Sequence, residues 1–211
     1  PLTTIKYNGE EFPLTHGTYG MYMQNSDREF RKLVFDEYYK SYISLINTIS
    51  AVYYGSVKSD VFSAKTRKYN SSLDGALIRE DVSPVVYKNL IDSVSQNVGL
   101  LHEYLEEKKK VLNLSEMHMY DVYVPTVPGA DLKLDFDKAY EMVINGLSIL
   151  GDDYVDLLKK AREERWIDVY EKPNKRSGAY SVAVYDTHPF VLLNYQQTTH
   201  DVFTIAHELG H

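Results

Sequence analysis

Apolar residues recur every three or four positions along most of the chain, which is the pattern of helices that bury one face. This spacing predicts a long helix from about residue 27 to 54, which extends in its longest form to residue 69. It predicts further helices over residues 83–113, 135–150 and 152–166. A last helix follows Thr198. The pattern therefore indicates a mainly α-helical protein.

Helix boundaries are marked by residues that satisfy or terminate the backbone hydrogen-bond ladder. Ser26 and Glu29 have capping-box spacing, in which each side chain accepts from a backbone N–H at a helix start. Thr198 and Asp201 repeat that spacing before the last helix. Gly151 separates the helices over 135–150 and 152–166, where it favours helix termination.

Two of these helices carry apolar stripes that we expect to be buried. The stripe of the helix over 83–113 consists of Tyr87, Leu90, Ile91, Val94, Val98, Leu101, Tyr104 and Leu105. The apolar face of the last helix consists of Val202, Phe203, Ile205, Ala206 and Leu209. We also expect Trp166 to be a buried anchor.

Strand signals occur at both ends of the chain. Asn8 and Gly9 lie between two short apolar runs and predict a β-hairpin, because both residues tolerate a positive φ. Three short runs rich in Val, Tyr and Phe, at 166–170, 179–185 and 190–195, predict strands joined by turns. We therefore expect a short β entry segment over residues 1–26 and a helical domain over 27–211, with a small antiparallel sheet just before the last helix.

Composition excludes several classes of protein. The chain has 211 residues, a formal net charge of −7 and no cysteine. A net negative charge argues against a general nucleic-acid binder, and the absence of cysteine excludes disulfides and thiolate zinc sites. No stretch reaches the ~20 apolar residues of a membrane span. We expect a cytoplasmic protein that binds neither nucleic acid nor membranes. Because the chain begins at Pro1 and ends at His211, we also expect it to be an interior segment of a longer polypeptide.

The candidate chemistry lies in the last five residues. His207, Glu208 and His211 form the His-Glu-x-x-His pattern, in which two imidazoles four residues apart lie on one side of a helix and bind zinc. Zinc lowers the pKa of its water toward ~7, and Glu208 would take the proton as that water attacks an amide carbonyl. The pattern thus indicates metal-assisted amide hydrolysis.

Other readings of the motif remain open at this level. Two solvated histidines at the end of a surface helix would make the motif incidental, and the protein a non-catalytic helical scaffold or interaction domain. A metal hydrolase acting on non-peptide amides is a further alternative. Sites of the deformylase type are disfavoured because they take a ligand from Cys. The five other histidines have no partner at metal-ligand spacing and are expected to be turn, cap or scattered residues: His16, His102, His118, His188 and His200.

The segment 175–211 resembles the zinc-site region of the oligoendopeptidase F family, within the thimet-oligopeptidase-like metallopeptidases. The matching residues are Lys175, Arg176, Gly178, Ala179 and Tyr180, then Pro189, Phe190, Leu192, Leu193 and Asn194, then Asp201, Phe203 and Thr204, then the motif itself. The resemblance implies the long-helix bundle of a zincin-type catalytic domain and a zinc metalloendopeptidase that cleaves peptide bonds in short peptides.

The resemblance also implies how the site is completed. His207 and His211 bind one Zn²⁺, Glu208 acts as general base and acid, and Gly178, Ala179 and Tyr180 contact the peptide at a strand edge. The third zinc ligand in the family is a Glu on a later helix, beyond His211. We therefore expect the domain to be truncated before that ligand, so that the segment is inactive without the remainder of its parent chain.

Overall fold

The computed structural model describes residues 3–127 and 133–211, and these divide into two compact units. The first unit combines residues 1–38 with 118–211, and the second consists of residues 39–117. This division by packing differs from the division predicted from the sequence. The predicted segments, a β entry over 1–26 and a helical domain over 27–211, remain a prediction.

The amino-terminal part of the first unit begins with the predicted hairpin. Strands β1 (Thr3–Tyr7) and β2 (Glu10–Leu14) are antiparallel, with Tyr7 opposite Glu10. Asn8 and Gly9 form the turn with φ of 51° and 85°, the positive values that this turn requires. The short helix α1 (His16–Tyr22) follows. A cluster of buried side chains closes this part: Ile5, Leu14, Met23, Phe30, Val34 and Tyr120.

Helix α2 (Arg28–Ser44) begins one residue later than the predicted start at residue 27. Asp27, and not Ser26, accepts hydrogen bonds from the backbone N–H groups of Glu29 and Phe30, at 3.0 and 3.3 Å. The predicted capping box at Ser26 was therefore wrong. A neighbouring aspartate has the same short acceptor side chain and occupies the cap position instead.

The long helix predicted from residue 27 is interrupted at Leu45, where φ is −109° and ψ is 12°. Helix α3 (Ile46–Thr66) continues after this residue. The side chain of Ser44 donates to the carbonyl of Ser41 at 2.7 Å, and such a bond bends helices because it competes with the backbone ladder. No proline or glycine marks the interruption, so the sequence pattern did not reveal it.

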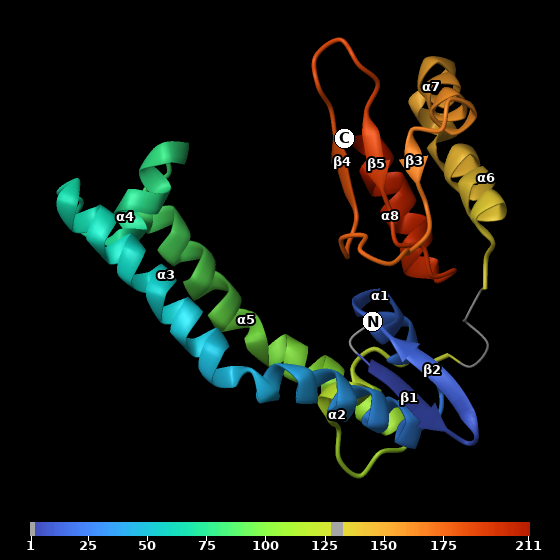
Figure 1. The fold of residues 1–211 in the computed structure, drawn as a ribbon, viewed down its shortest axis with the longest axis horizontal. Coiled ribbons are helices and arrows are strands. Elements are labelled where there is room, and N and C mark those ends of the chain that lie inside the picture. The colour runs from blue at the N-terminus through green and yellow to red at the C-terminus, as the bar shows by residue number, and fades with distance from the viewer. Residues whose placement is uncertain (1–2, 128–132) are drawn as a thin grey trace. The chain divides into compact units, whose positions relative to one another are not determined.

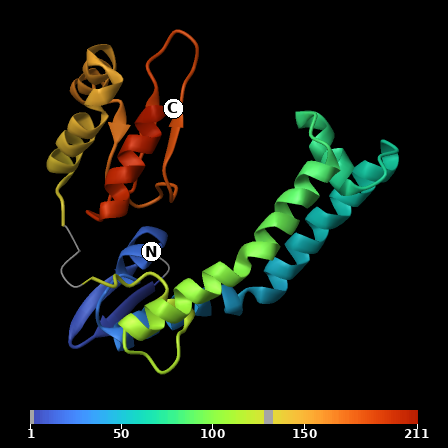
Figure 2. The ribbon, with the colours of Figure 1, turned by 180° about the vertical axis from the view of Figure 1, so that it is seen from behind.

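The second unit is built mainly from two long helices. Helix α3 is followed by α4 (Ser72–Leu77), the 3₁₀ turn η1 (Ile78–Glu80) and α5 (Pro84–Val111), and α3 and α5 run beside each other in both views (Figures 1 and 2). Helix α5 starts one residue after the predicted position, with Ser83 as N-cap and Pro84 in the first turn.

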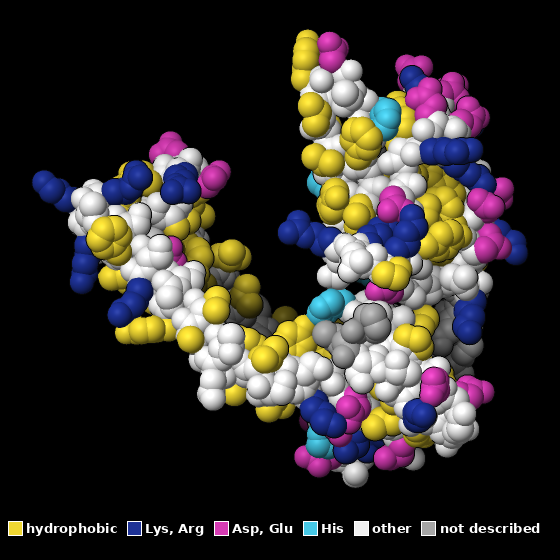
Figure 3. Space-filling view, in the orientation of Figure 1, with side chains coloured by type: hydrophobic (Ala, Val, Ile, Leu, Met, Phe, Trp, Pro, Cys, Tyr) yellow, Lys and Arg dark blue, Asp and Glu magenta, His cyan; other side chains and the backbone are white. Residues whose placement is uncertain are grey.

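The predicted burial of the α5 stripe was wrong in this structure. Seven of its eight residues are exposed, with values between 42% at Val98 and 64% at Leu90. The unit has two long helices and no described layer that covers this face, so the helical period is present without the burial that it usually indicates. Figure 3 shows hydrophobic side chains along the surface of these helices.

The carboxy-terminal part of the first unit alternates helices and short strands. After the 3₁₀ turn η2 (Met119–Asp121) and a connector come α6 (Phe136–Leu147), the 3₁₀ turn η3 (Ser148–Leu150) and α7 (Asp152–Glu163). Gly151 separates η3 from α7 with φ of 100°, as its predicted terminator role requires. Strands β3 (Ile167–Asp168), β4 (Tyr180–Val182) and β5 (Phe190–Leu192) then lead to α8 (Thr199–Gly210).

The three strands form a mixed sheet in the order β3-β5-β4. The pairing of β4 with β5 is antiparallel, as predicted, whereas β3 and β5 are parallel. The expectation of a wholly antiparallel sheet was wrong. After β3 the chain passes through β4, which runs in the opposite direction, and returns to the sheet as β5, which runs in the same direction as β3. Helices α6 and α8 pack with the sheet around one core: Ala139, Tyr140, Val143, Val191, Leu193, Tyr195 and Ile205. Trp166 is buried as expected.

Over the described ranges, the chain has no helix with the length and apolar character needed to cross a membrane.

Candidate active site

Helix α8 is fixed at its start by the predicted capping box. Asp201 accepts from the backbone N–H and the hydroxyl of Thr198, at 2.8 and 2.7 Å, and from the backbone N–H of Gln196 at 3.2 Å. The Thr198 hydroxyl in turn accepts from the N–H of Asp201. Asp201 therefore has the cap role expected from the sequence. Ile205 is fully buried in the core, so α8 is held at its first turn and along one face.

The motif residues occupy the end of this helix. The imidazole rings of His207 and His211 have centroids 4.9 Å apart and are nearly perpendicular, at 89°. Both side chains are exposed, whereas Glu208 is only 7% exposed. Within the described residues, neither imidazole has a hydrogen bond or ion pair, so their nitrogens are not committed to another partner.

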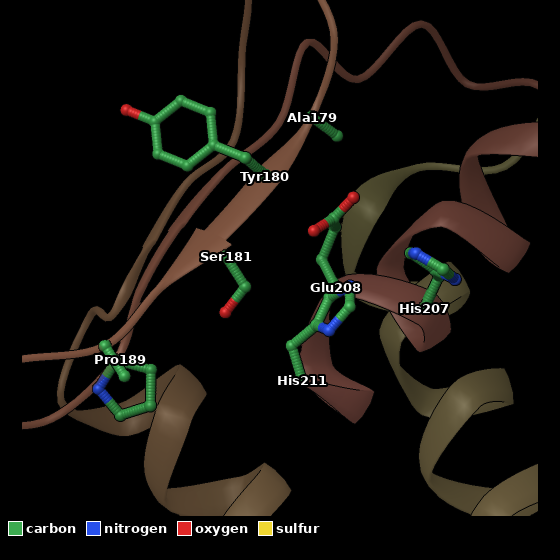
Figure 4. Close-up of a pocket in the computed structure, with 8 residues that line it drawn as sticks. Ala179, Tyr180, Ser181, Pro189, His207, Glu208 and His211 are labelled. Atoms are coloured by element: carbon green, nitrogen blue, oxygen red, sulfur yellow. The ribbon is translucent and has the colours of Figure 1, made fainter. Parts of the chain in front are cut away.

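A cavity of about 390 Å³ joins the end of α8 to strand β4. Figure 4 shows the Glu208 side chain directed toward the strand that carries Ala179, Tyr180 and Ser181. The complete lining consists of Ala179, Tyr180, Ser181, Ala183, Pro189, His207, Glu208 and His211. The structure thus brings five of the six predicted site residues to one cavity.

Gly178, the sixth predicted residue, lines a larger neighbouring cavity of about 1230 Å³ in the same unit. This cavity also contacts Ala179, His207 and Glu208 and is therefore continuous with the site. Phe203 lies on its wall and is 70% exposed. The prediction that Phe203 belongs to the buried face of α8 was wrong, because its side chain is turned toward this cavity rather than the core.

Strand β4 is an edge strand of its sheet. It pairs with β5 on one side, and no described strand pairs with it on the other. Its residues are partly open to solvent, with Tyr180 42% and Val182 46% exposed. An edge of this kind presents backbone N–H and C=O groups with which an extended peptide can pair.

Several residues near the site were not among the predicted site residues. Ser181, Ala183 and Pro189 line the smaller cavity. Asn194 donates through Nδ2 to the carbonyl oxygens of Arg176 and Gly178, at 2.9 and 2.7 Å. Asn194 lies in the segment that carries the family resemblance, but its bonds cross between segments that are far apart in sequence, and no local pattern indicates them.

The remaining histidines lie in other settings. His188 stacks on Trp166 with ring centroids 5.2 Å apart and an angle of 4°, and Nδ1 of His16 is 2.8 Å from the Tyr38 hydroxyl. His200 is exposed in the first turn of α8. Within the described ranges, no three His, Cys, Asp or Glu side chains group closely enough to hold a metal.

Two tyrosines beneath the site belong to the core. Burial raises the pKa of Tyr140 and of Tyr195 to about 12. Their hydroxyls donate to the carbonyls of Leu158 and Leu134, at 2.7 and 2.8 Å. Both phenols therefore stay protonated near neutral pH and support the elements that carry the site.

Comparison with known proteins places the chain in a family. The model of peptidase family M3 matches residues 21–211. Oligopeptidase PepF of Bacillus subtilis is 40% identical over 204 residues, and the match covers 97% of this chain and 30% of that protein. The chromosomal oligoendopeptidase F of Lactococcus lactis subsp. cremoris is 41% identical, with 96% and 34% covered. The chain thus spans about a third of the length of these curated relatives.

Solved structures show the same relation. The crystal structure of oligoendopeptidase-F from Enterococcus faecium matches with a TM-score of 0.58 and 31% identity, over 75% of this chain and 30% of that one. The structure of PZ peptidase A is only 18% identical but matches with a TM-score of 0.84, over 97% of this chain and 37% of that one, which shows a shared fold. The resemblance found in the sequence is confirmed, and the chain belongs to peptidase family M3.

Proposed function

We propose that this chain is part of the catalytic domain of a zinc metalloendopeptidase that hydrolyses peptide bonds in oligopeptides. The observation that carries the proposal is the shared cavity, which His207, Glu208 and His211 line together with residues of an edge strand. The relatives named oligopeptidase and oligoendopeptidase F support the same reaction class.

The donor set at the end of α8 fits a zinc ion. His207 and His211 supply two adjacent imidazoles whose nitrogens make no bond to another described residue, and neutral imidazole is a preferred zinc ligand. A Glu beyond His211 is the proposed third ligand. When bound, zinc polarises a carbonyl and makes hydroxide available near neutral pH.

Glu208 is the proposed general base and acid. It follows His207 directly in the sequence, and its carboxylate reaches into the cavity beside β4 (Figure 4). A carboxylate in that position takes a proton from the attacking water and passes it to the departing amine. Its burial keeps the group in one place between the two proton transfers.

Strand β4 is the proposed site of peptide binding. An extended peptide that pairs with its open edge is held through main-chain hydrogen bonds, which do not depend on the peptide's side chains. Gly178, Ala179 and Tyr180 stand where such a peptide passes the motif residues. With two of three zinc ligands, the 211-residue chain alone is expected to bind zinc weakly and to turn over no substrate.

The test is the substitution Glu208→Gln in the full-length gene product. It removes the proton acceptor and leaves both imidazoles, so peptide hydrolysis should fall by about a hundred- to ten-thousandfold, the usual contribution of a general base. Bound zinc should stay at wild-type stoichiometry. The measurements are cleavage of a quenched peptide and metal content.

Glu103→Gln, an exposed position on α5, is the matched control and should change neither quantity. Parental turnover by Glu208→Gln would exclude the mechanism. A wild-type protein that contains no zinc and cleaves no peptide would instead favour a non-catalytic scaffold.

A further inference from the structure

The loop between β3 and β4 is tied down at its beginning by Lys175. The Lys175 ammonium donates to the carbonyls of Asp168 and Tyr170, at 3.0 and 2.7 Å, and lies 3.4 Å from the Asp168 carboxylate. Its side chain is only 6% exposed. These contacts fix residues 168–175 but reach no residue of the final stretch before β4.

That final stretch is held by Asn194. Both bonds of its amide nitrogen go to carbonyls of the loop, 2.9 Å to Arg176 and 2.7 Å to Gly178. Two carbonyl acceptors fix the orientation of the amide, because a flipped side chain would place its oxygen against both carbonyls. In this orientation Oδ1 is buried and has no hydrogen-bond partner among the described residues. The orientation of the amide therefore satisfies the two loop carbonyls and leaves its own oxygen without a hydrogen bond.

The loop end that Asn194 holds leads directly into the site. Gly178 has φ of +86°, in the left-handed region that glycine adopts readily, and Ala179 alone separates it from the start of β4 at Tyr180. Asn194 comes two residues after the end of β5, the strand that pairs with β4. One side chain thus connects the end of the central strand to the start of the edge strand.

We propose that Asn194 is a positioning residue for peptide binding, which sets the place of Gly178 and Ala179 at the open edge of β4. This inference rests on the proposed function. Asn194 does not act on the reacting atoms. It determines the position of the backbone groups that pair with a peptide. Its removal should weaken peptide binding and leave the proton transfers at Glu208 unchanged.

The experiment compares Asn194→Leu and Asn194→Asp in the full-length gene product. Both variants keep the side-chain size but lack the two N–H donors. For a quenched peptide of about ten residues, long enough to pair with the strand edge, KM should rise about tenfold, the effect of losing two ordinary hydrogen bonds. The kcat should stay within about twofold, since a change confined to KM marks lost uniform binding.

Two further measurements separate positioning from a general loss of structure. Zinc should remain at one per chain in both variants, and amide hydrogen exchange should accelerate in residues 176–182 but not in α8. Asn97→Leu is the matched control, because Asn97 also donates its amide to a carbonyl, that of Ser93 at 2.8 Å, but does so on exposed α5. It should leave KM unchanged.

Each other outcome overturns the inference. A wild-type KM in either variant would show that the hydrogen bonds do not position the edge. A fall in kcat at unchanged KM, or loss of zinc in both variants, would make Asn194 a support of the reacting groups or of the whole fold. Glu208→Gln separates the two proposals: if it is inactive while KM in both Asn194 variants is unchanged, only this inference fails.

Discussion

Gly178 is the residue at which backbone conformation limits the sequence of the site most strongly. Its φ of +86° lies in the left-handed region, while no heavy atom lies within 4 Å of the position that a Cβ would take. The limit is therefore conformational and not one of space. Gly178→Ala should destabilise the protein by about 1–2 kcal/mol, the cost of that region for an L-residue. Urea denaturation at neutral pH measures the change.

Gly99 provides the opposite case. It lies inside α5, has no positive φ, and also has open space where the methyl group of an alanine would lie. Gly99→Ala should stabilise the protein by about 0.5–1 kcal/mol, because alanine loses less backbone entropy in a helix. Equal effects at the two positions would contradict the conformational account of Gly178.

The residues of the site differ in how far the sequence reveals them. His207, Glu208 and His211 are recognisable because their relation is local, one helical turn in length. Asn194 is not, because its function depends on carbonyls 16 and 18 residues earlier in the chain. The exposure of Phe203 was missed for a similar reason, since helical period does not say which side of a helix borders a cavity.

Among contacts between elements, one buried carboxylate joins η2 to the start of α2. Asp121 is fully buried and accepts from the guanidinium groups of Arg28 and Arg31, at 2.9 and 2.7 Å. It also accepts from the backbone N–H of His118 at 3.0 Å. These contacts hold together segments about 90 residues apart, at both ends of the second unit's sequence.

Asp121→Ala should therefore cost about 3–5 kcal/mol, because it leaves the buried Arg31 guanidinium without its carboxylate. Urea denaturation at pH 7 measures the loss. Asp36→Asn is the matched control: its ion pair with Lys32, at 3.0 Å, is about half exposed, and its removal should cost about 0.3–0.5 kcal/mol. A similar cost at both positions would show that burial of the Asp121 cluster adds nothing.

The same cluster makes the free energy of unfolding depend on pH. Burial raises the pKa of Asp121, but hydrogen bonds from Arg28, the His118 backbone and Arg31 outweigh it and hold the pKa below its ordinary value. A lowered pKa stabilises the folded state above the unfolded carboxyl's pKa of about 3.9, and this stabilisation is lost as pH falls further. The wild type should lose this contribution on acidification below that range, and Asp121→Ala should lack it. Urea denaturation repeated from pH 6 down to pH 3 compares the two.

Helices and the hairpin were predictable because their signals are short-range: the φ > 0 turn at Asn8 and Gly9, the cap at Thr198, the stop at Gly151. The interruption at Leu45 depends on a side-chain bond that any serine in a helix can form or omit. The direction of β3 relative to β5 depends on how the chain returns to the sheet. The spacing of the apolar residues predicts neither the helix interruption nor the strand direction.

At the scale of the whole molecule, the main feature is the apolar surface of the second unit. Val94 on α5 is 63% exposed, and Val52 and Phe62 on α3 are 69% and 70% exposed. Extensive exposed apolar surface promotes association. The purified 211-residue chain should self-associate as its concentration rises and bind a hydrophobic dye, which analytical ultracentrifugation and dye fluorescence detect.

A single charge placed on that surface tests the cause. Val94→Glu should weaken self-association, whereas Gln96→Glu, also exposed on α5, adds the same charge away from the stripe and should have a smaller effect. If both substitutions weaken association equally, net charge and not the apolar stripe governs it.

The shortness of β4 has a consequence for how long a peptide stays in place. Three residues offer only about two or three main-chain hydrogen bonds, and at about 0.5–1.5 kcal/mol each they sum to a few kcal/mol. Micromolar affinity requires about 8 kcal/mol. A peptide held in the proposed manner is thus bound weakly, and the two cleavage products dissociate from the strand quickly. The brevity of the edge favours rapid exchange of many different sequences over retention of any one.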